Sequence, residues 1–80
     1  MTVDDVKAVV VETLALEDRA DAIDANTPLL GSLPELDSMA VLEVILALEE
    51  RFGVAIDGDD VTADAFETLA SLTALVHSKL

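Results

Sequence analysis

Apolar residues recur at helical spacing near the start of the chain. The recurring positions are Val3, Val6, Val10, Thr13 and Leu14. Because residues three and four apart share one face of a helix, this spacing predicts a helix that ends near Leu16. Thr2 is its candidate N-cap, since a threonine oxygen accepts hydrogen bonds from the unpaired N–H groups of a first turn. The valines at positions 9–11 are poor helix formers, so we expect packing to hold them in the helix.

The longest and most apolar helical pattern covers residues 38–52, with Asp37 as its expected N-cap and Gly53 as its C-terminal stop. Leu36 and Val41 are placed to form a hydrophobic staple around that start. One side of the helix carries a core stripe of Val41, Val44, Ile45, Leu48 and Phe52. The opposite side carries Met39, Glu43, Leu46 and Glu50, flanked by Leu42 and Glu49.

The three large apolar residues on that opposite side, Met39, Leu42 and Leu46, require an explanation. Single exposed apolar residues are common, but several beside glutamates on one helix face indicate a surface that another protein covers. The alternative is that the long connector before this helix packs over part of the face.

The remaining pattern completes an all-α fold. A connector of about 20 residues, punctuated by Pro28, Gly31 and Pro34, separates the first two helices and is long enough to be ordered over the core or functional. A short helix is predicted over residues 60–65, and a last helix follows Thr68 as its N-cap. The core stripe of that last helix is Leu69, Leu72, Val76 and Leu80. We expect one domain over residues 1–80, a four-helix bundle with a short third helix and a long ordered loop between helices 1 and 2.

The charge of the chain limits the classes of molecule that we expect it to bind. Seventeen acidic residues against four basic ones give a net charge of −13, which repels nucleic acids and anionic membranes and attracts basic protein surfaces. No apolar run approaches the roughly 18 residues of a membrane span, and the first residues lack the basic and apolar regions of a signal peptide. There is no cysteine. We expect a cytoplasmic monomer whose partners are basic proteins.

The sequence contains few residues that are suitably placed for catalysis or for metal binding. His77 is the only histidine, and nothing in the sequence places it as a base beside Ser38. A calcium loop of the EF-hand type beginning at Asp57 would need ligands at Val61 and Thr68, and it would need a glycine where Thr62 stands. The sequence therefore predicts neither catalytic residues nor a metal site.

Ser38 stands in the first turn of the second predicted helix. A helix start carries partial positive charge and unpaired N–H groups, so a phosphate attached to this serine would gain roughly 0.3–1 kcal/mol. Serine is also common in first turns for capping alone, which leaves a purely structural interpretation open.

The sequence resembles the acyl carrier proteins. Asp37-Ser38-Met39 and the stretch that follows to Val54 resemble the recognition helix of that family, and residues 6–10 and 66–69 resemble its first helix and the entry to its last. The resemblance implies phosphopantetheine attached covalently to Ser38, with Asp37 as part of the motif. It implies binding of a phosphopantetheinyl transferase, an acyl- or aminoacyl-loading ligase and downstream biosynthetic enzymes. The implied partner contacts are Met39, Leu42, Glu43, Leu46, Glu49 and Glu50.

Two positions depart from the family pattern. Met39 replaces the usual leucine at similar volume, and Ala40 stands where carriers of fatty-acid synthesis often have aspartate. Together with the Leu33-Pro34-Glu35-Leu36 lead-in, these departures favour a discrete carrier of a specialised pathway over a housekeeping one. The function that the resemblance implies is that of a discrete carrier that moves acyl thioesters in a fatty-acid-like, polyketide or other specialised pathway. An aminoacyl or peptidyl carrier of a nonribosomal-peptide-type pathway is the alternative. A non-covalent acidic adaptor and a small enzyme that uses Ser38 are further alternatives.

Overall fold

The computed structural model describes residues 2–29 and 37–80 of the chain. The described elements are α1 (Val3–Leu14), the 3-10 helix η1 (Glu17–Ala22), α2 (Ser38–Phe52), the 3-10 helix η2 (Gly58–Asp60) and α3 (Leu69–Ser78). No strand forms in this part of the chain, where an isolated antiparallel bridge pairs Pro28 with Thr68. The predicted all-α class is confirmed.

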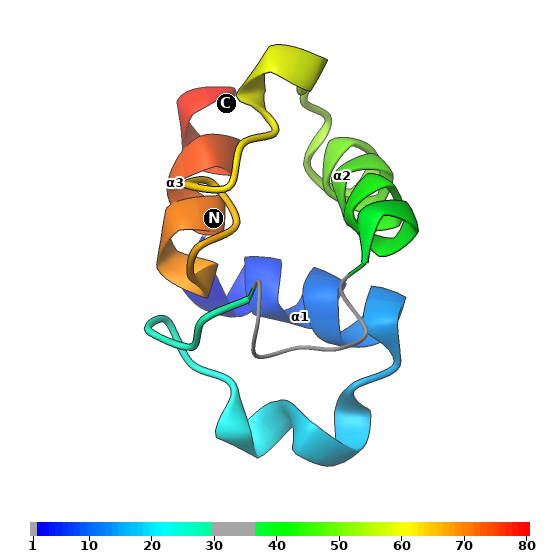
Figure 1. The fold of residues 1–80 in the computed structure, drawn as a ribbon, viewed down its shortest axis with the longest axis vertical. Helices are drawn as coiled ribbons and strands as arrows, with labels where there is room; N and C mark the ends of the chain where they lie inside the picture. Colours follow the sequence, from blue (N-terminus) through cyan, green and yellow to red (C-terminus); the bar gives the residue numbers. More distant parts are fainter. Residues whose placement is uncertain (1, 30–36) are drawn as a thin grey trace.

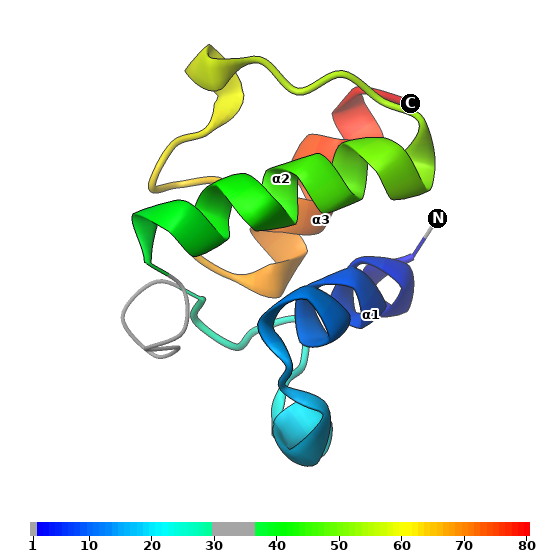
Figure 2. The same ribbon diagram turned by 90° about the vertical axis from the view of Figure 1, so that its right-hand side faces the viewer.

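Helix α1 lies against both other α-helices. Figure 1 shows α1 passing below the other two, with α3 on one side, α2 on the other and η1 beneath it. In Figure 2, α1 and α2 run in opposite directions, with α3 behind α2. The three helices thus enclose a single core.

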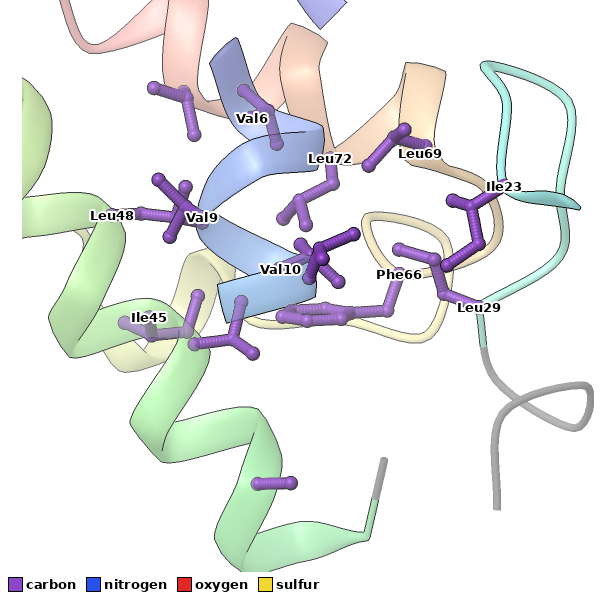
Figure 3. Close-up of a cluster of buried hydrophobic side chains, with 14 of the residues drawn as sticks. Val6, Val9, Val10, Ile23, Leu29, Ile45, Leu48, Phe66, Leu69 and Leu72 are labelled. Atoms are coloured by element: carbon purple, nitrogen blue, oxygen red, sulfur yellow. The ribbon is translucent and has the colours of Figure 1, made fainter. Parts of the chain in front are cut away.

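The core is aliphatic apart from Phe66. Six of the described side chains have no exposed surface: Val6, Val44, Leu48, Leu69, Leu72 and Val76. Figure 3 shows Val9 of α1 and Leu48 of α2 directed toward one another, with the Phe66 ring beneath Val10. All three valines at positions 9–11 are at most 8% exposed, so burial outweighs their weak helix propensity, as predicted.

Helix α1 ends at Leu14, two residues before the predicted end. Ala15 adopts a left-handed conformation with φ 55°, and the N–H of Leu16 then donates to the Val11 carbonyl oxygen at 2.9 Å. A left-handed alanine is unfavourable in isolation. It is retained because the turn carries Leu16 into the core, where that side chain is 1% exposed.

The connector between α1 and α2 is tied to the start of α3 in the part that the structure describes. The Leu29 N–H donates to the Glu67 carbonyl oxygen at 3.0 Å, and the Ala70 N–H donates to the Ala25 carbonyl oxygen at 2.9 Å. Ile23 and Leu29 are both buried. Residues 30–36, and with them the predicted staple of Leu36, lie outside the described residues.

The short third helix is a 3-10 helix over Gly58–Asp60, so the predicted range of residues 60–65 is wrong. The Asp57 N–H donates to an Asp60 carboxylate oxygen at 3.1 Å, and the Ala65 N–H donates to Thr62 Oγ1, also at 3.1 Å. Side chains of this kind offer the backbone an alternative to helical hydrogen bonds, which limits the helix to one turn.

Helix α3 begins as predicted. The Ser71 N–H donates to Thr68 Oγ1 at 3.1 Å, and the Thr68 N–H donates to Ser71 Oγ at 3.0 Å, which forms a reciprocal cap. The prediction of Leu80 as a core residue is wrong. Because α3 ends at Ser78, Leu80 lies beyond the helical face and is 63% exposed.

Candidate functional site

The backbone at Asp37 and Ser38 is that of a capped helix start. Asp37 is extended, with φ −92° and ψ −176°, and Ser38 is the first residue of α2. The Asp37 carboxylate accepts a hydrogen bond from the Ala40 N–H at 2.8 Å, so the predicted N-cap is confirmed. Both Asp37 and Met39 are exposed, which places residue 38 between two residues that face solvent.

The start of α2 is electrostatically suited to an anion. Its first turn contains no acidic residue, and only Asp37 stands directly before it. Among the described residues at this helix start, the carboxylate of Asp37 is the one negative charge, and it is hydrogen-bonded to the Ala40 N–H. Ala40 is 7% exposed, so its small side chain belongs to the core rather than to the surface beside Ser38.

The apolar residues predicted on the outward face of α2 are exposed to solvent. Met39, Leu42 and Leu46 are 66%, 57% and 63% exposed. Glu43 and Glu50 are exposed on the same helix. These exposures show that the described part of the connector, up to residue 29, does not pack over the three apolar residues.

Glu49 has a different environment from the other five residues of the predicted partner surface. It is half-buried, and one of its carboxylate oxygens accepts a hydrogen bond from the Ile56 N–H at 2.8 Å. This hydrogen bond links the segment after α2 to the last turns of the helix. Nothing in the sequence spacing indicates it, because it depends on how the chain turns after Gly53.

An apolar hollow of about 220 Å³ lies beside the first half of α2. Its lining residues are Val41, Val61, Thr62, Ala63 and Phe66. Val41 is three residues after Ser38, and residues at this spacing are neighbours on a helix. The sequence pattern does not predict the hollow, because it favours a short helix over residues 60–65, where the structure has a turn at residues 63–66.

The other candidate features are a metal site at the acidic run, His77 and a membrane span. Among residues 2–29 and 37–80, no group of three or more histidine, cysteine or acidic side chains is arranged to hold a metal ion. The Asp60 carboxylate of the acidic run is instead paired with Lys79 Nζ at 2.8 Å. His77 is exposed near the end of α3. No helix within the described ranges is long and apolar enough to cross a membrane.

The family model described as the phosphopantetheine attachment site matches residues 4–76. An acyl carrier protein of Campylobacter jejuni is 48% identical over 59 residues, which cover 74% of this chain and 73% of the relative. The chain belongs to the acyl carrier protein family. An acyl carrier protein of Helicobacter hepaticus is 31% identical over 77 residues, which cover 96% and 95%. The solution NMR structure of a holo acyl carrier protein from Nitrosomonas europaea matches with a TM-score of 0.87 and 43% identity, and the match covers 95% of this chain and 92% of that one.

Acyl carrier proteins are carriers rather than catalysts, and their cofactor is covalently attached phosphopantetheine. The predictions of family, of a non-catalytic protein and of this cofactor are confirmed. The start of α2 fits such a group, because its first turn combines the positive end of a helix, free of acidic residues, with exposed neighbours at Asp37 and Met39. Members of the family interact with a phosphopantetheinyl transferase and with biosynthetic enzymes.

Proposed function

We propose that Ser38 is the residue that carries phosphopantetheine and that the chain moves acyl intermediates between enzymes of a fatty-acid-like, polyketide or other specialised pathway. The observation that carries this proposal is the position of Ser38 as the first residue of α2, directly after the N-cap Asp37. A phosphodiester at this position benefits from the positive end of a helix of 15 residues.

The other described serines are engaged in local structure. Ser71 Oγ donates to the carbonyl oxygens of Ala65 and Thr68, both at 2.8 Å, and it also accepts from the Thr68 N–H. Ser78 Oγ donates to the Leu75 carbonyl oxygen at 2.6 Å. Modification of Ser71 would dismantle the cap of α3. Ser32 lies outside the described residues, and it lacks the preceding aspartate that Ser38 has.

The bound group would supply the thiol that the chain lacks, since there is no cysteine. An acyl group held as a thioester on that thiol remains covalently attached while it passes between enzymes. The contribution of the protein is to present the attachment site at an exposed helix end and to be recognised by successive partners.

The outward face of α2 supports recognition by basic partners. Met39, Leu42 and Leu46 offer apolar contact, and Glu43 and Glu50 add exposed negative charge beside them. Exposed charges act mainly on the rate of encounter, while apolar contacts retain the complex. In addition to any partner contact, Glu49 stabilises the segment after α2 through its hydrogen bond from the Ile56 N–H.

The apolar hollow beside α2 favours an acyl cargo over an aminoacyl one. Val41 and Phe66 contribute to its lining, and a space of about 220 Å³ suits a short hydrocarbon chain better than a charged amino group. Loading the phosphopantetheine form with an octanoyl group should raise the melting temperature, whereas glycyl loading should leave it unchanged. Equal melting temperatures for the two loaded forms would favour the aminoacyl or peptidyl alternative.

Intact-mass measurement tests the attachment site. The wild type, Ser38→Ala and the control Ser78→Ala are each incubated with a broad-specificity phosphopantetheinyl transferase and coenzyme A. We expect the prosthetic mass on the wild type and on Ser78→Ala, and none on Ser38→Ala, with circular dichroism showing that all three are folded. A Ser38→Ala protein that still gains the mass would refute the assignment. A folded wild type that gains none would favour the non-covalent adaptor.

A further inference from the structure

A groove of about 520 Å³ opens between α1 and α2, and the carrier role does not account for it. Its lining residues are Val9, Glu12, Thr13, Ala47, Glu50 and Arg51. The floor is apolar, since Val9 is 4% exposed and Ala47 is half-buried. Glu12 and Glu50 are exposed and belong to α1 and α2, which form the two walls.

Neither wall carboxylate has a partner in the part of the chain that the structure describes. No hydrogen bond or ion pair of Glu12 or Glu50 is formed among residues 2–29 and 37–80. Two carboxylates from different helices over an apolar floor match the two parts of a long basic side chain. Such a side chain buries its hydrocarbon stem against apolar surface and directs its charged end to the carboxylates.

We propose that this groove binds an arginine or lysine side chain of a partner protein, as a second contact beside the outward face of α2. The two surfaces are continuous, because Glu50 lines the groove and lies four residues after the exposed Leu46, so the two are neighbours on the helix. The net charge of −13 disfavours an anionic occupant. A partner that covers Leu46 therefore reaches α1 through the groove, and α1 becomes part of the recognition surface.

Among the described residues that line the groove, Arg51 is the one basic residue, and its substitution should change peptide binding in the opposite direction to that of Glu12. The positive charge of Arg51 lies in the same groove and repels an incoming cation. Removal of Arg51 should therefore strengthen binding of a basic side chain, whereas removal of Glu12 should weaken it. A residue with only a structural role would not produce this pair of opposite effects.

The inference rests on the proposed function only for the identity of the partners, so its test uses a defined peptide. The isotope-labelled chain is titrated at low ionic strength with a short amphipathic helical peptide built from leucine, alanine and arginine. We expect amide chemical-shift changes at Val9, Glu12 and Thr13 of α1 in addition to changes along α2. Changes confined to α2 would overturn the proposal.

Charge variants with matched controls make the test quantitative. Glu12→Gln should weaken peptide binding by about two- to fivefold, as expected for an exposed ion pair. Glu17→Gln, which makes the same charge change at an exposed position in η1, should bind as the wild type does. Arg51→Gln should strengthen binding by a similar factor, and Lys7→Gln, outside the groove lining, should not. Equal effects within either pair would show a response to net charge alone and would refute the groove.

Modification of Ser38 separates failure of the groove from failure of the carrier function. If Glu12→Gln accepts phosphopantetheine fully but binds the peptide as Glu17→Gln does, the groove is refuted and the carrier assignment stands. If the wild type accepts no phosphopantetheine while the α1 shifts and the opposite charge effects are observed, the groove stands without the carrier assignment.

Discussion

The carboxylate of Glu49 accepts a hydrogen bond from the backbone N–H of Ile56 at 2.8 Å, seven residues further along the chain. The backbone of the same residue is also engaged, because the N–H groups of Gly53 and Val54 both donate to the Glu49 carbonyl oxygen. Gly53 permits this arrangement with φ 65°, a left-handed conformation that glycine adopts without steric cost. The chain then returns so that Ile56 is 8% exposed.

We predict that Glu49→Ala lowers the free energy of unfolding by about 1–2 kcal/mol, because it leaves the half-buried Ile56 N–H group without its charged acceptor. Glu43→Ala is the matched control on the same helix, and its effect should stay within about 0.5 kcal/mol since Glu43 is exposed. Chemical denaturation of both variants measures the difference. Equal stabilities would show that the bond to Ile56 contributes nothing.

We predict that Asp37→Ala lowers the free energy of unfolding by about 1 kcal/mol, because it removes the acceptor of the Ala40 N–H. Asp37→Asn should retain nearly full stability, since asparagine caps helices as well as aspartate does. Urea denaturation compares the two variants. If both lose the same stability, the charge of Asp37 matters rather than its capping oxygen.

Leu46 and Leu48 are two residues apart on α2. Substitution of Leu48 should lower stability, whereas substitution of Leu46 should weaken partner binding and leave stability nearly unchanged. Leu48 is fully buried, so Leu48→Ala should cost about 2–5 kcal/mol of unfolding free energy. Leu46 is 63% exposed, so Leu46→Ala should change stability by no more than about 0.5 kcal/mol. Leu46→Ala should instead weaken binding of the transferase, measured by titration. Unchanged binding would remove Leu46 from the partner surface.

The ion pair between Lys79 and Asp60 predicts a pH-dependent contribution to stability. The hydrogen bond from Lys79, assisted by the Asp57 N–H, lowers the pKa of Asp60 below 3.8. Stabilisation through a lowered carboxyl pKa is complete above the unfolded-state value and is lost as the pH falls through the folded-state value. The same bond raises the pKa of Lys79 above 10.5, so its contribution is complete below that pH and is lost as the pH rises through the higher folded-state pKa.

Lys79→Gln should therefore lower the melting temperature slightly between these limits, as for other surface pairs, and should match the wild type well below pH 3.8. Thermal denaturation across this range measures the difference between the two proteins. Adding Lys79→Gln to Asp60→Asn should have no further effect. A Lys79→Gln difference that is the same at low and neutral pH would contradict the pairing.

The net charge of −13 predicts that salt stabilises the fold. Repulsion among the acidic residues opposes the compact state, and physiological salt limits its reach to about 8 Å. Moderate sodium chloride should raise the melting temperature, and millimolar magnesium should raise it further. Asp59→Asn should reduce the magnesium gain, because Asp59 lies in the acidic run while Asp60 is already paired with Lys79. A melting temperature that does not change with salt would rule out this account.

Much of the site could be predicted from local pattern. The bounds of α2, its cap at Asp37, its stop at Gly53 and the exposure of Leu46 all follow from periodicity and from the residue types at helix ends. These features depend on residues within a turn or two of one another, so the sequence expresses them directly. The family resemblance rested on the same stretch, which is why the carrier family could be predicted together with the helix.

Contacts between distant residues required the tertiary structure. The early end of α1 at Leu14 depends on the burial of Leu16, and the hydrogen bond between Glu49 and Ile56 depends on the return of the chain after α2. The hollow beside Val41 and the groove at Glu12 each combine residues that are far apart in sequence. Periodicity determined which face of each helix is apolar. Only the packing of α1, α2 and the segment after η2 decided which of these faces meet and where space remains between them.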